Sequence, residues 1–329
     1  MLKKLFLAAF LLAVVVGGWL AYFASRPLDL PASPFEFELR QGTTLKGVSR
    51  QLWGAQVLSD PWSFALLGRL LGMQGQVKAG NYELESGLTA FGLLVKITRG
   101  DVTQEGITFI EGWNFRQLRA ALDAQPHLRH DSQGMSEAEI LAAIGAGESQ
   151  AEGLFLPDTY YVSKGSSDLA LLKRAYQGMK KRLAGAWENR DPAVPYTDPY
   201  QALIMASIVE KETGKASERP MIAGVFLNRL RIGMRLQTDP TVIYGLGERF
   251  DGNLRKIDLL TDTPYNTYTR AGLPPTPIAM PGKEAIEAAL HPEQTKALYF
   301  VAKGGGEHYF SNTLAEHNAA VARYQLRRQ

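Results

Sequence analysis

The stretch from Asp198 to Gly214 constrains the fold most, because it predicts a helix whose surface is apolar on nearly every side. Asp198 followed by Pro199 is typical of a helix start, with a side-chain acceptor at the cap and then a residue that needs no backbone donor. Gly214 can take the left-handed conformation that ends a helix. Residues 202–209 are apolar except for Ser207. We therefore expect protein to surround this helix at the centre of a large domain.

Two glutamates, Glu210 and Glu212, fall in the last turn of the predicted helix. Burial and the negative end of the helix dipole both oppose ionisation there, so such a carboxyl group can stay protonated near neutral pH and act as a general acid. Glu212 continues the apolar stripe of Met205 and Ile208, whereas Glu210 lies about 200° around the axis from it. The alternative is that both are solvated charges paired with Lys211 or an arginine.

Residues 5–23 form an uncharged apolar run that is long enough to cross a bilayer. Lys3 and Lys4 precede it, which predicts a cytoplasmic N-terminus (residues 1–4), a single-pass anchor (residues 5–24) and export of the rest of the chain. Trp19 and Tyr22 fit an interfacial belt on the far side. The alternative is a cleaved signal peptide, but the run is longer than usual and no clear A-x-A site follows it.

Composition narrows the remaining classes of function. The 329 residues are 45% hydrophobic, which is enough for two domains with sizeable cores. The net charge of +3 does not suggest a nucleic-acid-binding protein. With no cysteine and with five histidines that lack zinc-ligand spacing, we expect no disulfide, no metal site and no cofactor.

The residues after the anchor divide into a linker and a small domain. Residues 25–34 contain three prolines and predict a stiff, extended spacer. Residues 35–105 predict a strand (35–39), two helices (45–52 and 61–71), a strand (77–84) and a helix (89–99). The first four elements resemble the small lysin-motif fold, a β-α-α-β unit that binds glycan chains. The alternative is a spacer or a partner-docking domain.

Residues 106–329 predict a larger mixed domain, so the fold class is α+β. A strand near 107–109 and a helix over 115–122 precede a polar loop and the turn-rich segment 152–162. Helices follow over 168–189, 199–214 and 218–232, the last capped by Ser217 and ended by Gly233. Asp239 starts a short helix, and 298–302 and 312–326 predict a strand and a final helix.

The loop over residues 263–282 combines two tyrosines and an asparagine with five prolines. Such a rigid loop can present aromatic faces and amide groups, which commonly hold sugar rings. The alternative is an ordinary proline-rich connector.

Several long segments resemble one family. They are EGLFLPDTY, MASIVEKET, SER at 217–219, NRLRIGMRLQTDPTVIYGLGER, DTPYNTYTRAGLPPTPIAMPG, HPE and LYFVA. Together they resemble the membrane-anchored endolytic murein transglycosylases, the YceG-like (MltG) family, over nearly the whole chain.

This resemblance implies cleavage of the β-1,4 bond between N-acetylmuramic acid and N-acetylglucosamine within peptidoglycan strands, giving 1,6-anhydro ends. It implies that Glu212, the second glutamate of the E-K-E-T run, is the catalytic acid and base. The expected location is the cytoplasmic (inner) membrane, with the catalytic domain outside the cytoplasm. Expected partners are glycan strands, the membrane and peptidoglycan synthases.

Further residues are assigned as candidates beside Glu212. Those expected to hold the sugars are Gln237, Asp239, Tyr265, Asn266 and Tyr268, whereas Glu210 and Glu218 are expected to support the structure, Glu218 through the dipole of the following helix. Two other classes of function remain open. One is a muramidase that uses water as the acceptor, and the other is a non-catalytic, membrane-tethered glycan-binding protein.

Overall fold

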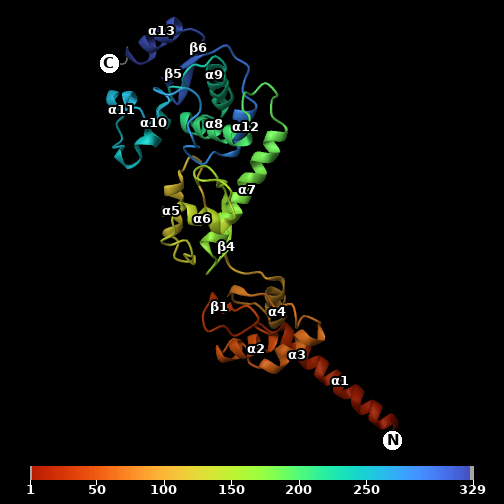
Figure 1. Ribbon diagram of the computed structural model, residues 1–329. Helices are drawn as coiled ribbons and strands as arrows, with labels where there is room; N and C mark the ends of the chain where they lie inside the picture. The colour runs from red at the N-terminus through yellow and green to blue at the C-terminus, as the bar shows by residue number, and fades with distance from the viewer. Residues whose placement is uncertain (1, 327–329) are drawn as a thin grey trace. The chain divides into compact units, whose positions relative to one another are not determined.

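The computed structural model describes residues 2–326, which form two compact units (Figure 1). The first unit takes the described residues up to Gly106 together with Tyr161–Gly165, and the second takes the rest. Helices and strands are mixed, with three two-stranded sheets in the described part of the chain. The chain is therefore a mixed α and β protein with one long apolar helix at its N-terminus.

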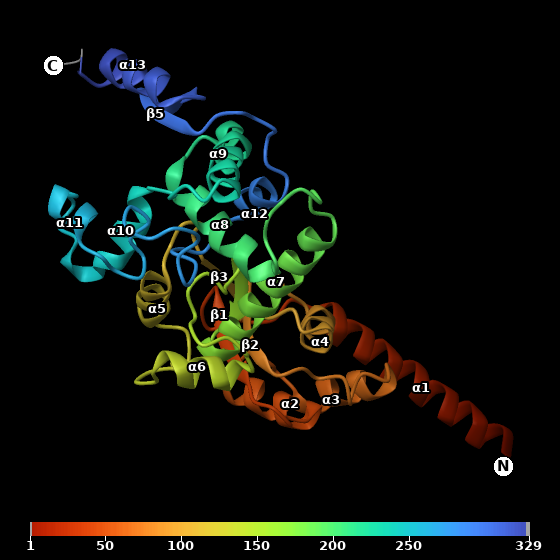
Figure 2. The same ribbon diagram turned by 45° about the horizontal axis from the view of Figure 1, so that its top comes forward.

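The first unit combines a two-stranded sheet with helices. Its elements are α1 (Leu2–Ser25), β1 (Phe35–Leu39), α2 (Leu45–Gly54), α3 (Pro61–Leu70), β2 (Gly80–Leu84) and α4 (Ala90–Arg99). β1 and β2 pair antiparallel, with Phe35 opposite Leu84 and Leu39 opposite Gly80. Figure 2 shows α2 and α3 side by side. The order β1-α2-α3-β2 agrees with the elements expected from the sequence.

Local sequence explains where the helices of the first unit begin. Thr44, Asp60 and Thr89 each cap a helix by accepting from a backbone N–H in its first turn, as short polar side chains at this position commonly do. The apolar faces of these helices meet in one core, in which Leu39, Phe64, Tyr82, Leu84 and Leu93 have almost no exposed surface.

Residues 25–34 do not form the free spacer that the prolines predicted. The backbone N–H of Leu28 donates to the carbonyl of Leu88 at 2.8 Å, and Pro27 forms a bridge with Thr89. Leu28 and Leu30 pack against the core of the first unit. The chain leaving α1 is therefore packed on this unit along its proline-rich segment.

Helix α1 is long and apolar enough to cross a membrane, with a mean hydropathy of 2.3 over its most apolar window. Only 6% of that window is buried inside the protein. These properties are consistent with a single-pass membrane anchor.

The second unit is mainly helical. Its elements are α5 (Phe115–Asp123), α6 (Glu137–Ile144), α7 (Asp168–Glu188), α8 (Pro199–Glu212), α9 (Arg219–Arg231), α10 (Asp239–Leu246), α11 (Lys256–Leu260), α12 (Lys283–Leu290), β5 (Tyr299–Gly304), β6 (Glu307–Ser311) and α13 (Leu314–Tyr324). β5 and β6 form an antiparallel hairpin. β3 (Gln104–Thr108) and β4 (Thr159–Ser163) form the remaining two-stranded sheet.

Helix α8 lies at the centre of the second unit, as its sequence predicted. Figures 1 and 2 show α7, α9 and α12 around it, and every residue from Ala202 to Val209 is buried. Asp198 caps the helix by accepting from the N–H of Gln201 at 3.0 Å. The buried Ser207 hydroxyl donates to the carbonyl of Ile204 and accepts from the N–H of Ile278. This polar residue therefore ties a loop onto the central helix.

Two predicted helix ends were wrong. α8 ends at Glu212 and continues into an extended residue, Thr213, so the expected left-handed turn at Gly214 does not form. Ser217 lies within a 3-10 turn (Ala216–Glu218) and does not cap α9, whose cap position is occupied by Glu218 without a capping hydrogen bond. At the first place Glu212 bonds to Thr238 and at the second Glu218 bonds to His308, and the local sequence contains neither contact.

Candidate active site

Glu212 is the last residue of α8, and one carboxylate oxygen, Oε1, accepts from the hydroxyl of Thr238. Burial raises the pKa of Glu212 to about 6, and the charge of Asp239 adds to this rise. The Thr238 hydrogen bond and the charges of His308 and Arg229 oppose the shift. Glu212 can therefore carry a proton close to neutral pH.

Thr238 is positioned by an extended segment that follows α9. Its N–H donates to the hydroxyl of Thr267 at 3.1 Å, and its carbonyl accepts from the hydroxyl of Thr241 at 2.7 Å. Thr238 also occupies the cap position of α10, yet its hydroxyl makes no capping bond because it points to Glu212. The sequence did not indicate this role for Thr238, since its place before Asp239 and Pro240 predicted only a helix start.

Arg229 places a buried positive charge near Glu212. Its guanidinium donates to the carbonyls of Leu298 at 2.6 Å and Leu236 at 2.5 Å, and lies 5.4 Å from the centre of the Tyr299 ring. Only 6% of Arg229 is exposed, and this burial lowers its pKa. The arginine thus fixes β5 and the segment before Thr238 around the carboxyl group. No pattern in the sequence distinguished Arg229 from the other arginines.

Glu218 holds His308 beside the site. The N–H of His308 donates to Oε1 of Glu218 at 3.1 Å, and its Nδ1 shares a hydrogen bond of 2.8 Å with Oε2. Both side chains are 13% exposed. The contact joins the start of α9 to β6, so Glu218 acts here through a side-chain pair in addition to any dipole effect at the helix.

Asp239 and Tyr268 are brought together next to Glu212. The Tyr268 hydroxyl donates to the Asp239 carboxylate, and burial together with that carboxylate raises the pKa of the tyrosine. The Tyr268 carbonyl accepts from Arg235. Asp239 is the first residue of α10, directly after Thr238 at the cap position. Gln237, which is exposed on the same segment, has a positive φ of 49°.

Asn266 does not have the sugar-binding role expected from the sequence. It has no exposed surface, and its amide nitrogen donates to the carbonyls of Asp258, Leu259 and Thr261. Its side-chain oxygen accepts from the N–H of Tyr268 at 2.8 Å. Since these bonds occupy both ends of the amide, Asn266 organises the loop that carries Tyr268.

The loop over residues 263–282 is only partly a surface feature. Residues 276–282 are buried, and the N–H of Met280 donates to the carbonyl of Trp113 at 2.7 Å. The N–H of Gly282 donates to Glu210 at 2.9 Å. The second half of the loop is therefore mostly part of the core around α8, and its first half is the more exposed.

Tyr265 lines a cleft of about 1050 Å³ between α5 and α10. Its hydroxyl shares a hydrogen bond of 2.8 Å with Thr276, and its ring packs edge-on against Tyr244 at 4.8 Å between centres. Lys211, which immediately precedes Glu212, lines the same cleft. A groove of this size with tyrosine walls can accommodate several sugar rings.

Glu152 is a second buried carboxyl group, in the wall of this cleft. Burial raises its pKa to about 7. Both oxygens accept from the N–H of Phe115, at the start of α5, and Oε2 also accepts from the Tyr244 hydroxyl at 3.1 Å. Because these donors already surround the carboxyl group, Glu152 is placed to hold the cleft wall rather than to protonate a ligand.

Glu210, in contrast with Glu212, is bonded within the core. Its side chain is 7% exposed, and Oε1 accepts from Arg219 at 3.2 Å while Oε2 accepts from Gly282. Arg219 also pairs with Glu284 at 2.5 Å. These contacts join α8, α9 and the start of α12. The two glutamates of the last turn thus have separate surroundings, and only Glu212 has that of a general acid.

Comparisons with known proteins find relatives whose descriptions agree with one another. Residues 37–323 match the model of the YceG-like family. An endolytic murein transglycosylase of Bacillus subtilis is 30% identical, covering 94% of this chain and 91% of its own length. The enzyme of that name in Streptococcus pneumoniae strain D39 is 29% identical over 75% of this chain, which spans 51% of that relative. A crystal structure of a putative YceG-like protein of Listeria monocytogenes covers 88% of this chain and 100% of its own, with a TM-score of 0.56 and 31% identity.

Proposed function

This chain belongs to the YceG-like family, and on that premise we propose that it is an endolytic murein transglycosylase. Its substrate would be the β-1,4 bond between N-acetylmuramic acid and N-acetylglucosamine inside a glycan strand, and its products would end in 1,6-anhydro-N-acetylmuramic acid. The observation that carries the proposal is Glu212, a carboxyl group with a pKa of about 6 at the end of the buried helix α8.

One carboxyl group is sufficient for this reaction. Protonated Glu212 gives its proton to the glycosidic oxygen as the bond to C1 of the muramic acid breaks, and the N-acetylglucosamine leaves with a free hydroxyl. The C6 hydroxyl of the same muramic acid attacks C1, and its proton passes to the Glu212 carboxylate. The acid is thereby restored and no water is consumed. The internal hydroxyl is favoured over bulk water because its effective concentration at C1 is far higher.

Neighbouring residues support this cycle. The Thr238 hydroxyl donates to the carboxylate form, and the charges of Arg229 and His308 also stabilise that form. Burial and Asp239 favour the protonated form. Such opposing effects keep the pKa near the working pH, where one group can both give and accept a proton.

A muramidase would normally need a second free carboxylate to activate water or to attack the sugar. Three carboxylates that lie near Glu212 in the chain or act on its charge are already bonded: Glu210 to Arg219, Glu218 to His308 and Asp239 to the Tyr268 hydroxyl. This arrangement favours the internal hydroxyl as the nucleophile.

We assign the sugar contacts to Gln237, Asp239, Tyr265 and Tyr268, because each has exposed or partly exposed surface close to Glu212 or on the adjoining cleft. Residues 106–329 would form the catalytic domain. Residues 35–105 would form a lysin-motif-like domain that binds glycan.

The chain would be held by α1 in the cytoplasmic membrane, with its N-terminus inside and its catalytic domain outside the cytoplasm. There it would act on nascent strands beside the peptidoglycan synthases. The apolar surface of α1 supports the anchor.

The product decides between the mechanisms. The full chain in detergent micelles is incubated with purified glycan strands in ¹⁸O-labelled water, and the products are identified by mass spectrometry. Anhydro ends, each one water lighter than a reducing end and free of label, are expected. Labelled reducing ends as the main product would show a muramidase.

The residue assignment is tested by Glu212→Gln, with Glu210→Gln as the matched control on the same turn. Loss of the acid is expected to reduce turnover by roughly 10²–10⁴-fold, because glutamine keeps the size of the side chain but cannot deliver a proton. The control is expected to retain most activity at 25 °C. Full activity in Glu212→Gln would remove this residue from the mechanism, and strand binding without any cleavage by the wild type would show a binding protein.

A further inference from the structure

The end of helix α1 is built into the first unit. Leu20 and Phe23 are only 6% and 8% exposed, and the indole Nε1 of Trp19 donates to the Ser63 hydroxyl of α3 at 2.9 Å. Residues 25–34 are also held on this unit. The unit therefore begins at the last turns of α1, with no tether between the apolar helix and the folded protein.

The length of α1 then determines how close the unit lies to the bilayer. The apolar run from Leu5 to Phe23 spans about 28 Å at 1.5 Å per residue, which is close to the roughly 30 Å of a hydrocarbon core. If the turns that pack into the unit stayed outside the membrane, the run from Leu5 to Gly18 would supply only about 21 Å. Since Lys4 must remain at the opposite surface, Trp19 to Phe23 must lie at membrane depth. Helix α3, which Trp19 contacts, is brought to the interface with them.

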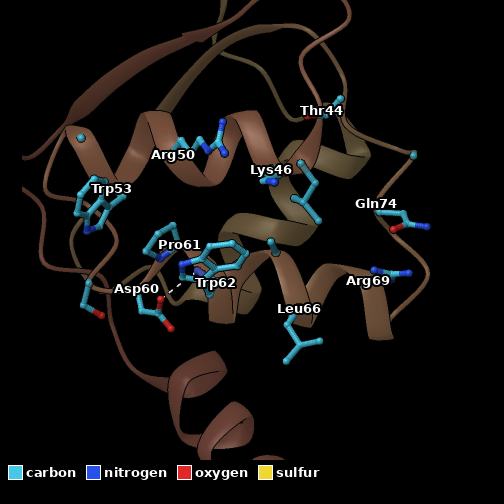
Figure 3. A pocket seen from close by; sticks show the side chains of 15 residues that line it. Thr44, Lys46, Arg50, Trp53, Asp60, Pro61, Trp62, Leu66, Arg69 and Gln74 are labelled. Carbon is cyan, nitrogen blue, oxygen red and sulfur yellow. Dashed lines mark hydrogen bonds between the residues drawn. The ribbon is translucent and has the colours of Figure 1, made fainter.

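Helix α3 carries an apolar stripe on its outer face. Trp62, Leu66 and Leu70 are four residues apart and 73%, 41% and 66% exposed. Residues at this spacing lie on one side of a helix. Figure 3 shows Trp62 and Leu66 projecting from α3, opposite Trp53 at the end of α2. A continuous apolar surface of this kind is unusual on a part of a protein that faces only water.

Three cations border the stripe. Lys46 and Arg50 lie on α2 and Arg69 on α3, around an open groove of about 1130 Å³ (Figure 3). Among residues 2–326, none of the three forms an ion pair with a carboxylate, and the Lys46 ammonium lies 5.7 Å from the centre of the Trp62 ring. The one carboxylate of the groove, Asp60, is occupied in capping α3. The surface thus combines indole, leucine and unpaired cations, which suits the headgroup region of an anionic bilayer.

We propose that the α2–α3 face, defined by Trp53, Trp62, Leu66, Leu70 and the cations Lys46, Arg50 and Arg69, docks on the bilayer that holds α1. Trp62, Leu66 and Leu70 enter the interfacial layer, and the three cations contact lipid phosphates. The inference rests on the proposed anchoring by α1. It fixes the face that the first unit turns to the membrane.

Single-cysteine labelling tests the proposal directly, because the chain contains no cysteine. The full chain is reconstituted in vesicles of phosphatidylethanolamine and phosphatidylglycerol, with an environment-sensitive fluorophore at Leu66→Cys, at Glu38→Cys on β1 or at Val15→Cys in α1. Lipids brominated in the acyl chain serve as quenchers. Labels at positions 66 and 15 are expected to be quenched and blue-shifted, whereas the label at position 38 stays aqueous.

Three other results would overturn the proposal. Quenching at position 15 alone would show that α1 is in the membrane and that the α2–α3 face does not contact the bilayer. No quenching at position 15 would remove the anchor and the docking together. A label at position 66 that stays aqueous in vesicles and is shielded only when glycan strands are added would assign the face to the strands.

The charges are tested by the variant Lys46→Gln/Arg50→Gln/Arg69→Gln, which leaves the residues placed around Glu212 intact. Each cation is expected to strengthen association with an anionic surface about fivefold, so the variant should lower the ratio of docked to undocked chains on the order of 100-fold. The loss should be absent in vesicles of phosphatidylcholine alone. An equal quenching of variant and wild type in anionic vesicles would show that the cations do not contact lipid.

Discussion

Replacing Thr238 by valine should move the pH profile of the enzyme, because it removes one hydrogen bond to Glu212 and changes little else. Valine has nearly the shape of threonine, and the N–H and carbonyl bonds of Thr238 to Thr267 and Thr241 do not involve the lost hydroxyl. The hydroxyl donates to a carboxylate oxygen, so it favours the ionised form and lowers the pKa of Glu212. Its removal must therefore raise that pKa.

The size of the shift follows from the strength of such a bond. A hydrogen bond to a charged group contributes about 1.5–3 kcal/mol, and one pKa unit corresponds to about 1.4 kcal/mol. The pKa of Glu212 should thus rise from about 6 in the wild type by roughly 1–2 units, to about 7–8. Activity that needs the protonated acid falls as the pH rises through this pKa, so the falling limb should move to higher pH.

The assay measures kcat/KM for glycan strands between pH 5 and pH 9. The limbs of this pH profile report the pKa values of the free enzyme. Thr238→Ser is the matched control, since serine keeps the hydroxyl and should keep the wild-type limb. Thermal unfolding of both variants shows whether the fold is intact. A folded Thr238→Val enzyme whose limb coincides with that of the wild type would refute the role given to this hydrogen bond, and so would equal shifts in the two variants.

Three further substitutions separate structural from chemical roles. Glu210→Gln should weaken the buried bond to Arg219 by about 1.5–3 kcal/mol and lower Tm by several degrees, measured by calorimetry; an unchanged Tm would contradict its role in the core. Asn266→Ala should lower the free energy of unfolding by about 2–4 kcal/mol, measured by thermal unfolding, because buried carbonyls lose their donor. Loss of strand binding at unchanged stability would instead show that Asn266 contacts the sugar. Burial raises the pKa of Glu152 to about 7 in the folded protein. As the pH rises from the lower pKa of the unfolded state to this value, the unfolded state loses the proton first, so the free energy of unfolding falls. Between pH 5 and pH 7.5, Tm of the wild type should therefore fall more than that of Glu152→Gln, and parallel Tm curves would show that Glu152 is ionised throughout.

Much of the central helix could be predicted from the sequence because its signals are local. Asp198 and Pro199 define the start of α8, and the apolar run after them requires burial whatever encloses it. The same local signals place Glu210 and Glu212 in the last turn on different sides. Local signals cannot show which of the two is the acid, because Arg219 and Gly282, which bind Glu210, come from other elements.

The surroundings of Glu212 could not be predicted for the same reason. Asn266 is of a residue type that commonly binds sugars. Only the fold shows that its amide nitrogen donates to three backbone carbonyls. Arg229 is one of several arginines in a helix, and its burial depends on β5. Short elements such as α12 and β6 were also missed, since eight or fewer residues carry too little periodicity and owe their structure to packing.

Helix α10 begins without a side-chain cap, although a threonine occupies the cap position. A capping bond typically stabilises a helix by about 1 kcal/mol, and asparagine or aspartate at position 238 would supply it better than threonine. Selection for thermal stability alone would favour such a change, yet it would remove the hydroxyl from Glu212 or place a new polar group against it. Position 238 is therefore a point at which stability and activity oppose each other. Efforts to stabilise this protein by improving its helix starts should leave this one unaltered.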